Sequence, residues 1–278
     1  MTATSDTTPQ WRRPLGAGPA IEDFFSGLAR VRTWVLLARR DIQMRYRRSM
    51  IGPFWISISM GVMVVALSFL YGGMFGQDAS SYQAYLSYLA CGFLAWGLLG
   101  GLVSEACNSV MESEAYLRNV PLPLTLIACR TVFRQFIFFL HNLVVIIPLV
   151  AWLGVGLKFS AIEALLGVGI YLLAGFGACL ALGPLCARYR DLPQVVANVM
   201  QALFFFTPIF WDPSAVPQRA ILVEANPFYQ FVQLIRAPIL GEGISEISLV
   251  YTLACVAALW AVGIGVFLWS RRQMYFWL

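Results

Sequence analysis

The sequence predicts an all-α, polytopic membrane protein with six transmembrane helices. Six stretches of the 278-residue chain lack Asp, Glu, Lys and Arg, apart from Glu105 at the end of the second. Each is long enough to cross a hydrocarbon core about 30 Å thick, which needs about 20 apolar residues in a helix. Backbone groups inside lipid must be satisfied within their own segment, so each stretch is expected to be helical. The stretches are Ser49–Gln77, Ala79–Glu105, Gln135–Leu157, Ala164–Ala187, Leu192–Trp211 and Ile247–Ser270.

The composition and charge distribution support this fold class. The chain is 59% hydrophobic and only 12% charged, whereas soluble domains carry about 25% charged residues. Sixteen of the 19 basic residues fall in alternate loops, on the side that also holds both termini. This bias predicts a cytoplasmic N-terminus and C-terminus. The net charge of +5 is therefore attributed to membrane orientation and not to a nucleic-acid partner.

The N-terminal region is expected to have two parts before the 49–278 transmembrane domain. Residues 1–20 are rich in Thr, Pro and Gly, which predicts a disordered tail. In residues 21–48, apolar side chains recur every three or four positions from Phe24 to Ile42, and arginines fall largely off that stripe. The pattern predicts an amphipathic helix in the cytoplasmic interface, in contact with membrane lipids. Docking of this helix on a partner subunit is an alternative that the pattern leaves open.

Two connecting segments have unusual composition. The loop that follows the second stretch contains a short, acidic helical pattern over 108–119, ended by Pro121 and Pro123. It is either a simple connector or a docking element. The long outer segment 212–246 is apolar around 226–240, which predicts short re-entrant helices half-embedded in the outer leaflet. That segment either lids an exit or forms a surface hairpin.

The chain lacks the sequence motifs of common enzymes and nucleotide-binding proteins. No GxxxxGK[ST], HExxH or GxSxG motif occurs, and no CxxC pair is present among the six cysteines. His141 is the only histidine of the chain, and it falls within the third predicted span. We expect it to be structural, bonded to a neighbouring helix, although a proton site is the alternative. These observations predict a conduit without catalytic residues or a metal site, powered by another protein.

Several motifs resemble one family. The run from Ala38 to Trp55, with the pattern R-D-I-x-x-R-Y-R-x-S-x-x-G-P-x-W, is similar to the entry of the first span in permease subunits of polysaccharide-export ABC transporters. These are the O-antigen, capsule and teichoic-acid exporters of the ABC-2 superfamily. A departure is Val120, where the family often has Phe before the first proline. Further similar motifs follow in the same order: Arg190-Asp191, Thr207–Trp211, Val216-Pro217, Asn226-Pro227 and Arg236.

The resemblance implies a homodimer that pairs with two copies of a separate ABC nucleotide-binding subunit. ATP and Mg would bind that subunit, and no cofactor would bind this chain. The substrate implied is a polyprenyl-pyrophosphate-linked glycan of the O-antigen type, exported across the bacterial inner membrane. The segment 105–119 would couple to the ATPase, and an outer gate would close the exit. The implied coupling residues are Glu105, Asn108, Glu112, Glu114, Tyr116 and Arg118, and the implied gate residues are Phe228, Tyr229 and Phe231.

Within this resemblance, aromatic and basic side chains are candidates for glycan contact. Sugar rings have apolar C–H faces that stack on aromatic rings, so an aromatic conduit would let a polymer slide. The alternative is that most of these rings face lipid. Arg45, Arg47 and Arg48 are candidates for the lipid pyrophosphate, or serve only topology and lipid binding. The conduit candidates are Trp55, Phe69, Tyr71, Tyr82, Tyr85, Tyr88, Phe93 and Trp96.

Two rival functions stay open on the sequence alone. One is an ABC-2 permease for a small amphiphile, such as a drug or antibiotic. The other is a channel or scaffold for glycan enzymes that needs no ATP. The polymer exporter and the amphiphile exporter differ in that a polymer needs a continuous hydrophilic, aromatic channel, whereas an amphiphile can use a lateral cleft.

Overall fold

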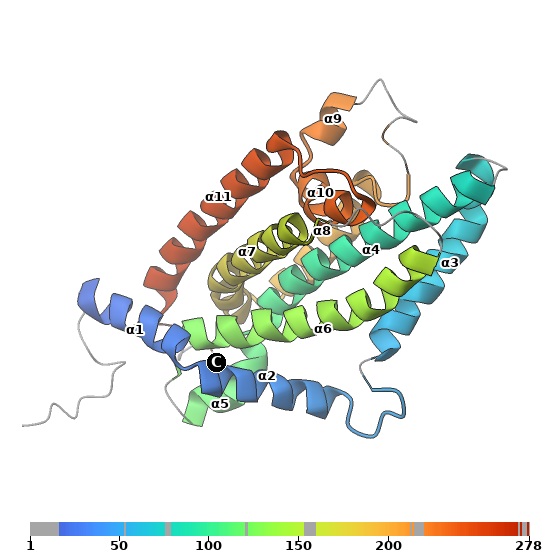
Figure 1. Cartoon of the computed structure of the whole chain (residues 1–278). Helices are drawn as coiled ribbons and strands as arrows, with labels where there is room; N and C mark the ends of the chain where they lie inside the picture. The colour runs from blue at the N-terminus through green and yellow to red at the C-terminus, as the bar shows by residue number, and fades with distance from the viewer. Residues whose placement is uncertain are drawn as a thin grey trace, which may run out of the picture.

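The computed structural model is helical throughout the residues that it describes, and those residues contain no β-strand, which confirms the all-α fold class (Figure 1). Five of its helices are long and apolar enough to cross a membrane. They are α3 (Phe54–Phe75), α4 (Ala79–Asn108), α6 (Leu124–Trp152), α7 (Ala161–Arg188) and α11 (Glu246–Ser270). The described residues are 17–52, 54–75, 79–119, 122–152, 160–211, 213, 220–271, 273 and 277. The predicted tail 1–20 lies mostly outside them.

The fifth predicted span forms a shorter helix than expected. Helix α8 (Leu192–Phe206) has 15 residues, which corresponds to about 22 Å at about 1.5 Å per residue. That length is less than the roughly 30 Å of a hydrocarbon core. The chain leaves the helix at Thr207 and continues to Trp211 without helical structure. A membrane-spanning role for this fifth segment, and with it a total of six spans, therefore stays a prediction.

The N-terminal region contains two helices where the sequence predicted one over 21–48. Helix α1 (Ala17–Ala29) and helix α2 (Val31–Arg45) meet at Arg30, and both pack against α6. The indole Nε1 of Trp34 donates a hydrogen bond to the carbonyl of Leu28 at 3.4 Å. This bond satisfies one of the carbonyls that a helix end leaves without an intrahelical partner. Figure 1 shows the two helices lying across one end of the bundle.

Helices α4, α7, α10 and α11 form the centre of the bundle. Helix α7 packs against both α4 and α11, and α10 (Pro227–Leu240) packs against α4, α7 and α11. Gly167 allows the closest of these approaches, because a Cβ there would lie 2.3 Å from the carbonyl oxygen of Leu234. The short helix α9 (Ala220–Glu224) precedes α10. Helices α9 and α10 therefore lie between the fifth predicted span and α11 along the chain.

The sequence fixes both ends of α10 locally. The side chain of Asn226 accepts a hydrogen bond from the amide of Phe228 at 2.9 Å, and Pro227 occupies the first turn. Asn at the N-cap and Pro directly after it are both typical of helix starts. Gly241 ends the helix at φ 85°, in the left-handed region that favours glycine. Nine of the fourteen residues of α10 are buried, more than expected for a segment half-embedded in the outer leaflet.

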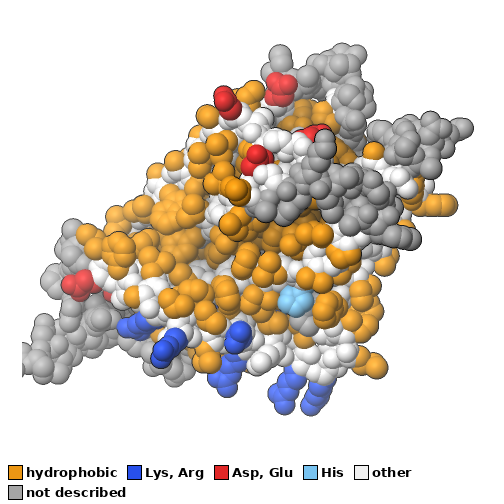
Figure 2. Space-filling model, in the orientation of Figure 1, with side chains coloured by type: hydrophobic (Ala, Val, Ile, Leu, Met, Phe, Trp, Pro, Cys, Tyr) orange, Lys and Arg blue, Asp and Glu red, His pale blue; other side chains and the backbone are white. Residues whose placement is uncertain are grey.

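The surface shows the band expected of a multi-pass membrane protein. In Figure 2, Lys and Arg side chains gather along the lower edge, the edge at which α2 lies in Figure 1. Acidic side chains gather at the upper edge, and mainly hydrophobic side chains cover the surface between them. Helix α3 exposes large apolar side chains such as Val62, Val65 and Leu70. An apolar belt between charged edges matches a protein surrounded by lipid.

Candidate functional site

The described residues contain a cluster of six charged side chains where α2, α4 and α6 meet the loop after α4. It includes three carboxylates and three guanidinium groups, so its formal charge is balanced. The loop forms a short 3-10 helix, η2 (Met111–Ser113), followed by α5 (Glu114–Asn119). The members of this charge cluster are Asp41, Arg45, Glu105, Glu112, Arg130 and Arg134.

Arg130 joins α6 to both α2 and η2. Its Nε and Nη2 donate to the two carboxylate oxygens of Asp41 at 2.6 and 2.7 Å, a bidentate arrangement. Its Nη1 donates to the hydroxyl of Ser113 at 2.9 Å. The guanidinium also lies 5.2 Å from the ring centroid of Tyr116 in α5. One side chain therefore bonds three segments of the chain.

Arg134, one helical turn further along α6, contacts three carboxylates. Its Nη1 donates to Asp41 at 2.9 Å, and its Nη2 donates to Glu112 at 2.8 Å and also to Glu105. Arg45 completes the cluster by donating to the other oxygen of Glu105 at 2.9 Å. Arg134 is 3% exposed. Neither Arg134 nor the buried Arg130 extends to the membrane–water interface. Burial of these two charges requires the paired carboxylates.

The predicted coupling residues fall in and around this cluster. Glu105 and Glu112 are members of it, and Tyr116 lies against Arg130. Asn108 donates to the carbonyl of Ser104 at 3.0 Å, within the last turn of α4. Glu112 keeps 39% of its side chain exposed, so a second protein can contact it. Glu114 begins α5, and the side chain of Arg118 lies outside the described residues.

Sequence reasoning missed three members of the charge cluster. Asp41 belongs to the R-D-I motif but was not assigned a role, and Arg130 and Arg134 were counted only among the sixteen basic residues on the inner side. Their spacing carried a signal, because residues four apart lie on one face of a helix. Two arginines on one face near the start of an apolar helix indicate acidic partners nearby. The last turn of α4 supplies one of those partners, Glu105, and the loop after it supplies another, Glu112.

The predicted entrance arginines occupy different environments. Arg45 is paired with Glu105, and its guanidinium lies 5.4 Å from the ring of Phe138. Arg47 and Arg48 are exposed beyond the end of α2, and Arg48 has φ 71°. Partial burial raises the pKa of Tyr46, against the opposing effect of Arg45, so this phenol stays protonated at neutral pH. The structure leaves Arg47 and Arg48 available to lipid head groups.

Three of the predicted conduit aromatics lie on the outside of this chain and two line a cavity. Trp55, Phe69 and Tyr82 are exposed. Phe93 and Trp96 on α4 line a cavity of about 410 Å³ between α3, α4 and α6. The two groups therefore have different surroundings, because only the second lines a cavity between helices.

The remaining conduit candidates hold the non-helical segment after α8. Tyr71 packs against Phe210 with ring centroids 5.9 Å apart. Tyr85 donates to the carbonyl of Phe210 at 2.8 Å, and Tyr88 lies 3.2 Å from the carbonyl oxygen of Pro208. Because the segment is not helical, its carbonyls lack intrahelical donors. The hydroxyls of Tyr85 and Tyr88 supply hydrogen bonds to two of them. Glycan contact by these three residues stays a prediction.

Arg236 on α10 supplies most of the remaining partners for this segment. It is 1% exposed, and its guanidinium donates to the carbonyls of Pro208 at 3.0 Å and Ile209 at 3.4 Å. The guanidinium also lies 3.8 Å from the ring centroid of Tyr88. Gly92 makes room for it, because a Cβ there would lie 2.3 Å from Nη2. A cation beside the C-terminal end of α8 also opposes the negative end of that helix dipole.

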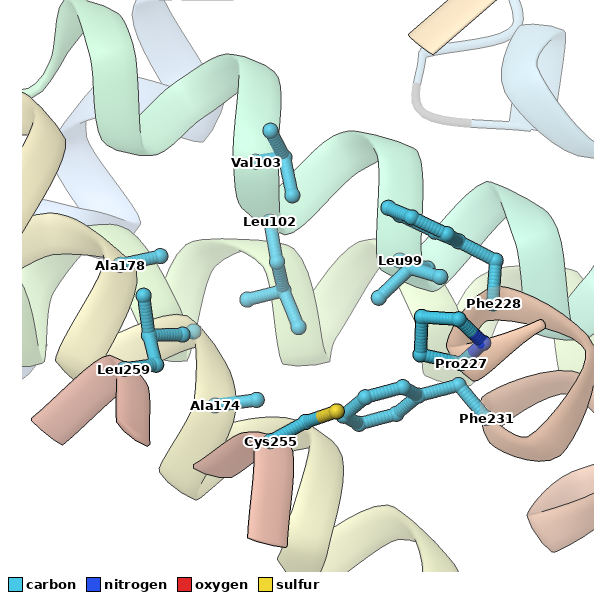
Figure 3. A pocket seen from close by; sticks show the side chains of 11 residues that line it. Leu99, Leu102, Val103, Ala174, Ala178, Pro227, Phe228, Phe231, Cys255 and Leu259 are labelled. Atoms are coloured by element: carbon cyan, nitrogen blue, oxygen red, sulfur yellow. The ribbon is translucent and has the colours of Figure 1, made fainter. Parts of the chain in front are cut away.

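Two of the three predicted gate residues line a second, apolar cavity of about 240 Å³ between α4, α7, α10 and α11 (Figure 3). Phe228 lines it and also lies 6.1 Å from Trp96 between ring centroids. Phe231 lines it and packs edge-on against Tyr171 at 5.4 Å. Tyr229 does not line this cavity; its hydroxyl accepts a hydrogen bond from Gln233 at 2.6 Å.

His141 is bonded within its own helix. Its Nδ1 lies 2.7 Å from the carbonyl of Ile137, and the ring packs against Phe54 at 5.6 Å. Because a carbonyl only accepts, Nδ1 carries the proton in this contact. The expected bond to a neighbouring helix is therefore wrong. No three His, Cys, Asp or Glu side chains gather at metal-binding distances within the described part of the chain.

The sequence pattern of the family described as "ABC-2 type transporter" matches residues 32–240. The chain belongs to this family. The match contains the charge cluster, the cavity beside Trp96 and the segment held by Arg236. Membership of a transporter membrane family, with the apolar helices described above, makes the chain a multi-pass membrane protein and a transporter subunit, not an enzyme.

Similar proteins extend the comparison beyond the matched residues. The chain is 21% identical over 250 residues to an O-antigen export system permease protein RfbA from Myxococcus xanthus, covering 87% of this chain and 93% of that protein. It is 20% identical over 201 residues to an RfbA of the same description from Klebsiella pneumoniae, covering 71% and 76%. A second Klebsiella pneumoniae RfbA is 19% identical over 200 residues. The resemblance found in the motifs is thereby confirmed along most of the chain.

Proposed function

We propose that this chain is the membrane-spanning subunit of an ATP-driven ABC exporter for a lipid-linked polysaccharide of the O-antigen type. The observation that carries the proposal is the match to O-antigen export permeases over 93% of the length of one relative. Two copies of the chain would pair with two copies of a nucleotide-binding subunit that holds ATP and Mg. The chain has no Walker motif of its own, which fits this division of roles.

The charge cluster supports a route from that ATPase to the membrane helices. The η2–α5 segment is tied to α6 through Glu112–Arg134 and Ser113–Arg130, and α6 is tied to α2 through Asp41. A displacement of the segment would therefore act on α6 and α2 together. A connector without this function needs no charge-balanced anchor, and burial of Arg130 and Arg134 is costly unless both are paired.

The exporter would lie in the bacterial inner membrane with both termini cytoplasmic. The basic edge in Figure 2 supports this orientation, because cytoplasmic loops carry an excess of Lys and Arg. Six spans and re-entrant outer helices complete this proposed topology. In it, α8 and the Thr207–Trp211 segment cross the membrane together, although neither is long enough alone.

Purification of the tagged chain in mild detergent from its native membrane tests the proposal. A nucleotide-binding subunit should co-purify in a one-to-one ratio, with vanadate-sensitive ATP hydrolysis. A stable homodimer without any such subunit, under conditions that preserve weak complexes, would contradict the proposal. It would favour the alternative of a channel or scaffold that needs no ATP.

A charge reversal tests the coupling role of the loop. Glu112→Arg together with Glu114→Arg should abolish glycan export and leave membrane insertion intact. The matched control is Glu242→Arg, because Glu242 is an exposed acidic residue in the turn after α10, at the opposite edge of the bundle. Export that persists in the double variant would contradict the coupling role.

A permease for a small amphiphile is the second candidate, and specific cavities favour it. The 240 Å³ cavity in Figure 3 and a cavity of about 380 Å³ beside Trp34 and Trp260 have only apolar linings. Small apolar ligands fit such sites. Transport of a fluorescent amphiphile by the purified complex, with no transport of lipid-linked glycan, would favour this candidate over the polysaccharide exporter.

A further inference from the structure

One cavity in the described structure differs from the others in its chemistry. It occupies about 410 Å³ between α3, α4 and α6, within the usual range for ligand pockets of about 300–1,000 Å³. Its walls combine aliphatic side chains, four aromatic rings, neutral polar side chains and one cation. The residues used below are Arg45, Phe93, Trp96, Gly97, Gln135 and Asn142, all of which line it.

The polar side chains of this cavity have unused hydrogen-bonding capacity. Gln135 on α6 is only 7% exposed, and its amide makes no hydrogen bond within the described part of the chain. Asn142 is also 7% exposed; its Oδ1 accepts a bond from Ser57 at 2.9 Å, and no described residue accepts from its Nδ2. Neither residue has a side-chain nitrogen or oxygen that is both fully buried and without a partner. The unpaired amide groups are therefore accessible, and they can bond a polar ligand in the cavity.

The arrangement of these groups suits a particular kind of ligand. Phe93 and Trp96 offer apolar ring faces on α4, and Gln135 and Asn142 line the cavity from α6. The amide oxygen of Gln135 lies close to α4, because a Cβ at Gly101 would be 2.6 Å from it. A sugar unit has both an apolar C–H face and hydroxyl groups at its edge, so it can use both walls. The two apolar cavities described above lack polar side chains and offer it no such bonds.

Arg45 adds a charge at one end of the cavity. Of the residues that line it, only Arg45 is charged. It lies at the end of α2, beside the start of α3, and the lining continues along α3 from Ile56 to Met63, about 10 Å at about 1.5 Å per residue. One Nη of Arg45 bonds Glu105, and guanidinium has further donors for a phosphate.

We propose that this cavity binds one phosphate-linked sugar unit of the substrate, with Gln135 and Asn142 on the hydroxyl groups and Arg45 on the phosphate. The inference rests on the proposed function for the identity of the substrate, but not for the presence of the site. The cavity extends from the charged edge of the bundle into the membrane-spanning region. A sugar unit bound there would have entered from the side of the bundle on which α2 lies.

Filling the cavity from its wall provides the cleanest test. Gly97 lines the cavity, and a Cβ built there meets no atom within 4 Å, so Gly97→Leu adds a side chain to the empty space without a clash at Cβ. The matched control is Gly265→Leu, because Gly265 is also a helix-interior glycine with open space around its Cβ. Both changes improve helix propensity equally, and only the first reduces the cavity.

Binding is measured on the full-length protein in lipid nanodiscs, so that no sugar-headed detergent competes. The probe is an octyl pyrophosphate carrying N-acetylglucosamine, and the reference probe is octyl pyrophosphate alone. The unmodified protein and the Gly265→Leu variant should bind the sugar probe more tightly than the reference. The Gly97→Leu variant should lose at least tenfold in affinity for the sugar probe, because the cavity is filled.

A second variant tests the amide itself. Gln135→Leu keeps the size of the side chain and removes its hydrogen-bonding groups, so the sugar probe should bind about threefold to tenfold more weakly. Gln194→Leu on α8 is the matched control, because Gln194 is exposed outside the cavity. Binding of the reference probe should be unchanged by Gln135→Leu, since that probe has no sugar.

Three outcomes would overturn the inference: no binding of the sugar probe by the unmodified protein, equal affinity for the two probes, or equal binding by Gly97→Leu and Gly265→Leu. Equal affinity would show that the sugar makes no contact and that the octyl chain or the pyrophosphate, which both probes share, accounts for binding. These results are independent of the ATPase test. Sugar binding without a co-purifying ATPase would refute the proposed exporter but not the sugar site. A co-purifying ATPase without sugar binding would refute the sugar site but not the exporter.

Discussion

Replacing Arg134 by methionine removes a guanidinium that bonds Asp41, Glu105 and Glu112. Breaking a buried ion pair typically costs about 3–5 kcal/mol, because it leaves an uncompensated charge. Here the loss should be smaller. Asp41 keeps its bidentate bond to Arg130, Glu105 keeps Arg45, and Glu112 is 39% exposed and can turn to water. We expect a loss of about 2–3 kcal/mol in the free energy of unfolding, after this allowance.

The measurement is unfolding by sodium dodecyl sulfate in mixed micelles, followed by circular dichroism. The variant Glu112→Gln alone should cost less than about 1 kcal/mol, because an exposed partner is screened by solvent. Combined with Arg134→Met, it should restore about 1 kcal/mol relative to the additive expectation, since charge balance in the cluster returns. The double-mutant cycle therefore isolates the contact that ties η2 to α6.

Arg188→Met is the matched control for the loss of an arginine. Arg188 is exposed at the end of α7, and its guanidinium lies 5.1–5.5 Å from three ring centroids, those of Tyr189, Trp269 and Trp277. Loss of each exposed cation–π contact should cost about 0.5–1 kcal/mol. If Arg134→Met costs no more than this control, or if the cycle is additive within about 0.5 kcal/mol, the charge cluster is not a mechanical anchor and the coupling route through α6 is refuted.

Three further predictions concern the opposite end of the bundle. Arg236→Met should lower the free energy of unfolding by about 2–4 kcal/mol, because the buried carbonyls of Pro208 and Ile209 lose a charged donor. Arg236→Lys should recover part of this loss. Equal stability of the Arg236→Met variant and the unmodified protein would contradict the role of Arg236 as a donor to this segment. Gly92→Ala should reduce the thermal unfolding temperature through its clash with that guanidinium, whereas Gly97→Ala, with open space at Cβ, should leave it unchanged or raise it. Phe228→Ala with Tyr229→Ala should make the resting protein leaky to small ions in liposomes; an unchanged leak would favour a surface hairpin without a gating role.

The sequence predicted the fold class because lipid restricts the possible structures. A long apolar run inside a bilayer must satisfy its own backbone, so composition and length suffice to predict α3, α4, α6, α7 and α11. The ends of α10 were also readable, since Asn226, Pro227 and Gly241 act through local geometry. The break at Arg30 was not readable, because no proline or glycine marks it and both adjoining helices follow the surface of α6.

The acidic segment at the end of α4 and in the loop after it shows where the prediction of a site ended. Glu105 and Glu112 were predicted as coupling residues from the resemblance, and the spacing of Arg130 and Arg134 indicated acidic partners without identifying them. Their partners come from α2 and α6, and the closest in sequence, Arg134 with Glu112, are 22 residues apart. Pairing between segments this distant depends on how the helices pack, so a single sequence cannot assign it.

By itself, the sequence determined the membrane class, the helical fold, the charged edge and the family resemblance. These properties follow from hydrophobicity, charge position and local motifs, each of which acts within a few neighbouring residues. Only the tertiary structure decided that Arg236 is a buried donor, that Tyr85 and Tyr88 hold the segment after α8, and that Gln135 opens into a cavity. An arginine or a glutamine has the same local pattern on a surface as in a core. Its partners are set by helices far away in the chain, and their packing is decided only when the whole bundle forms.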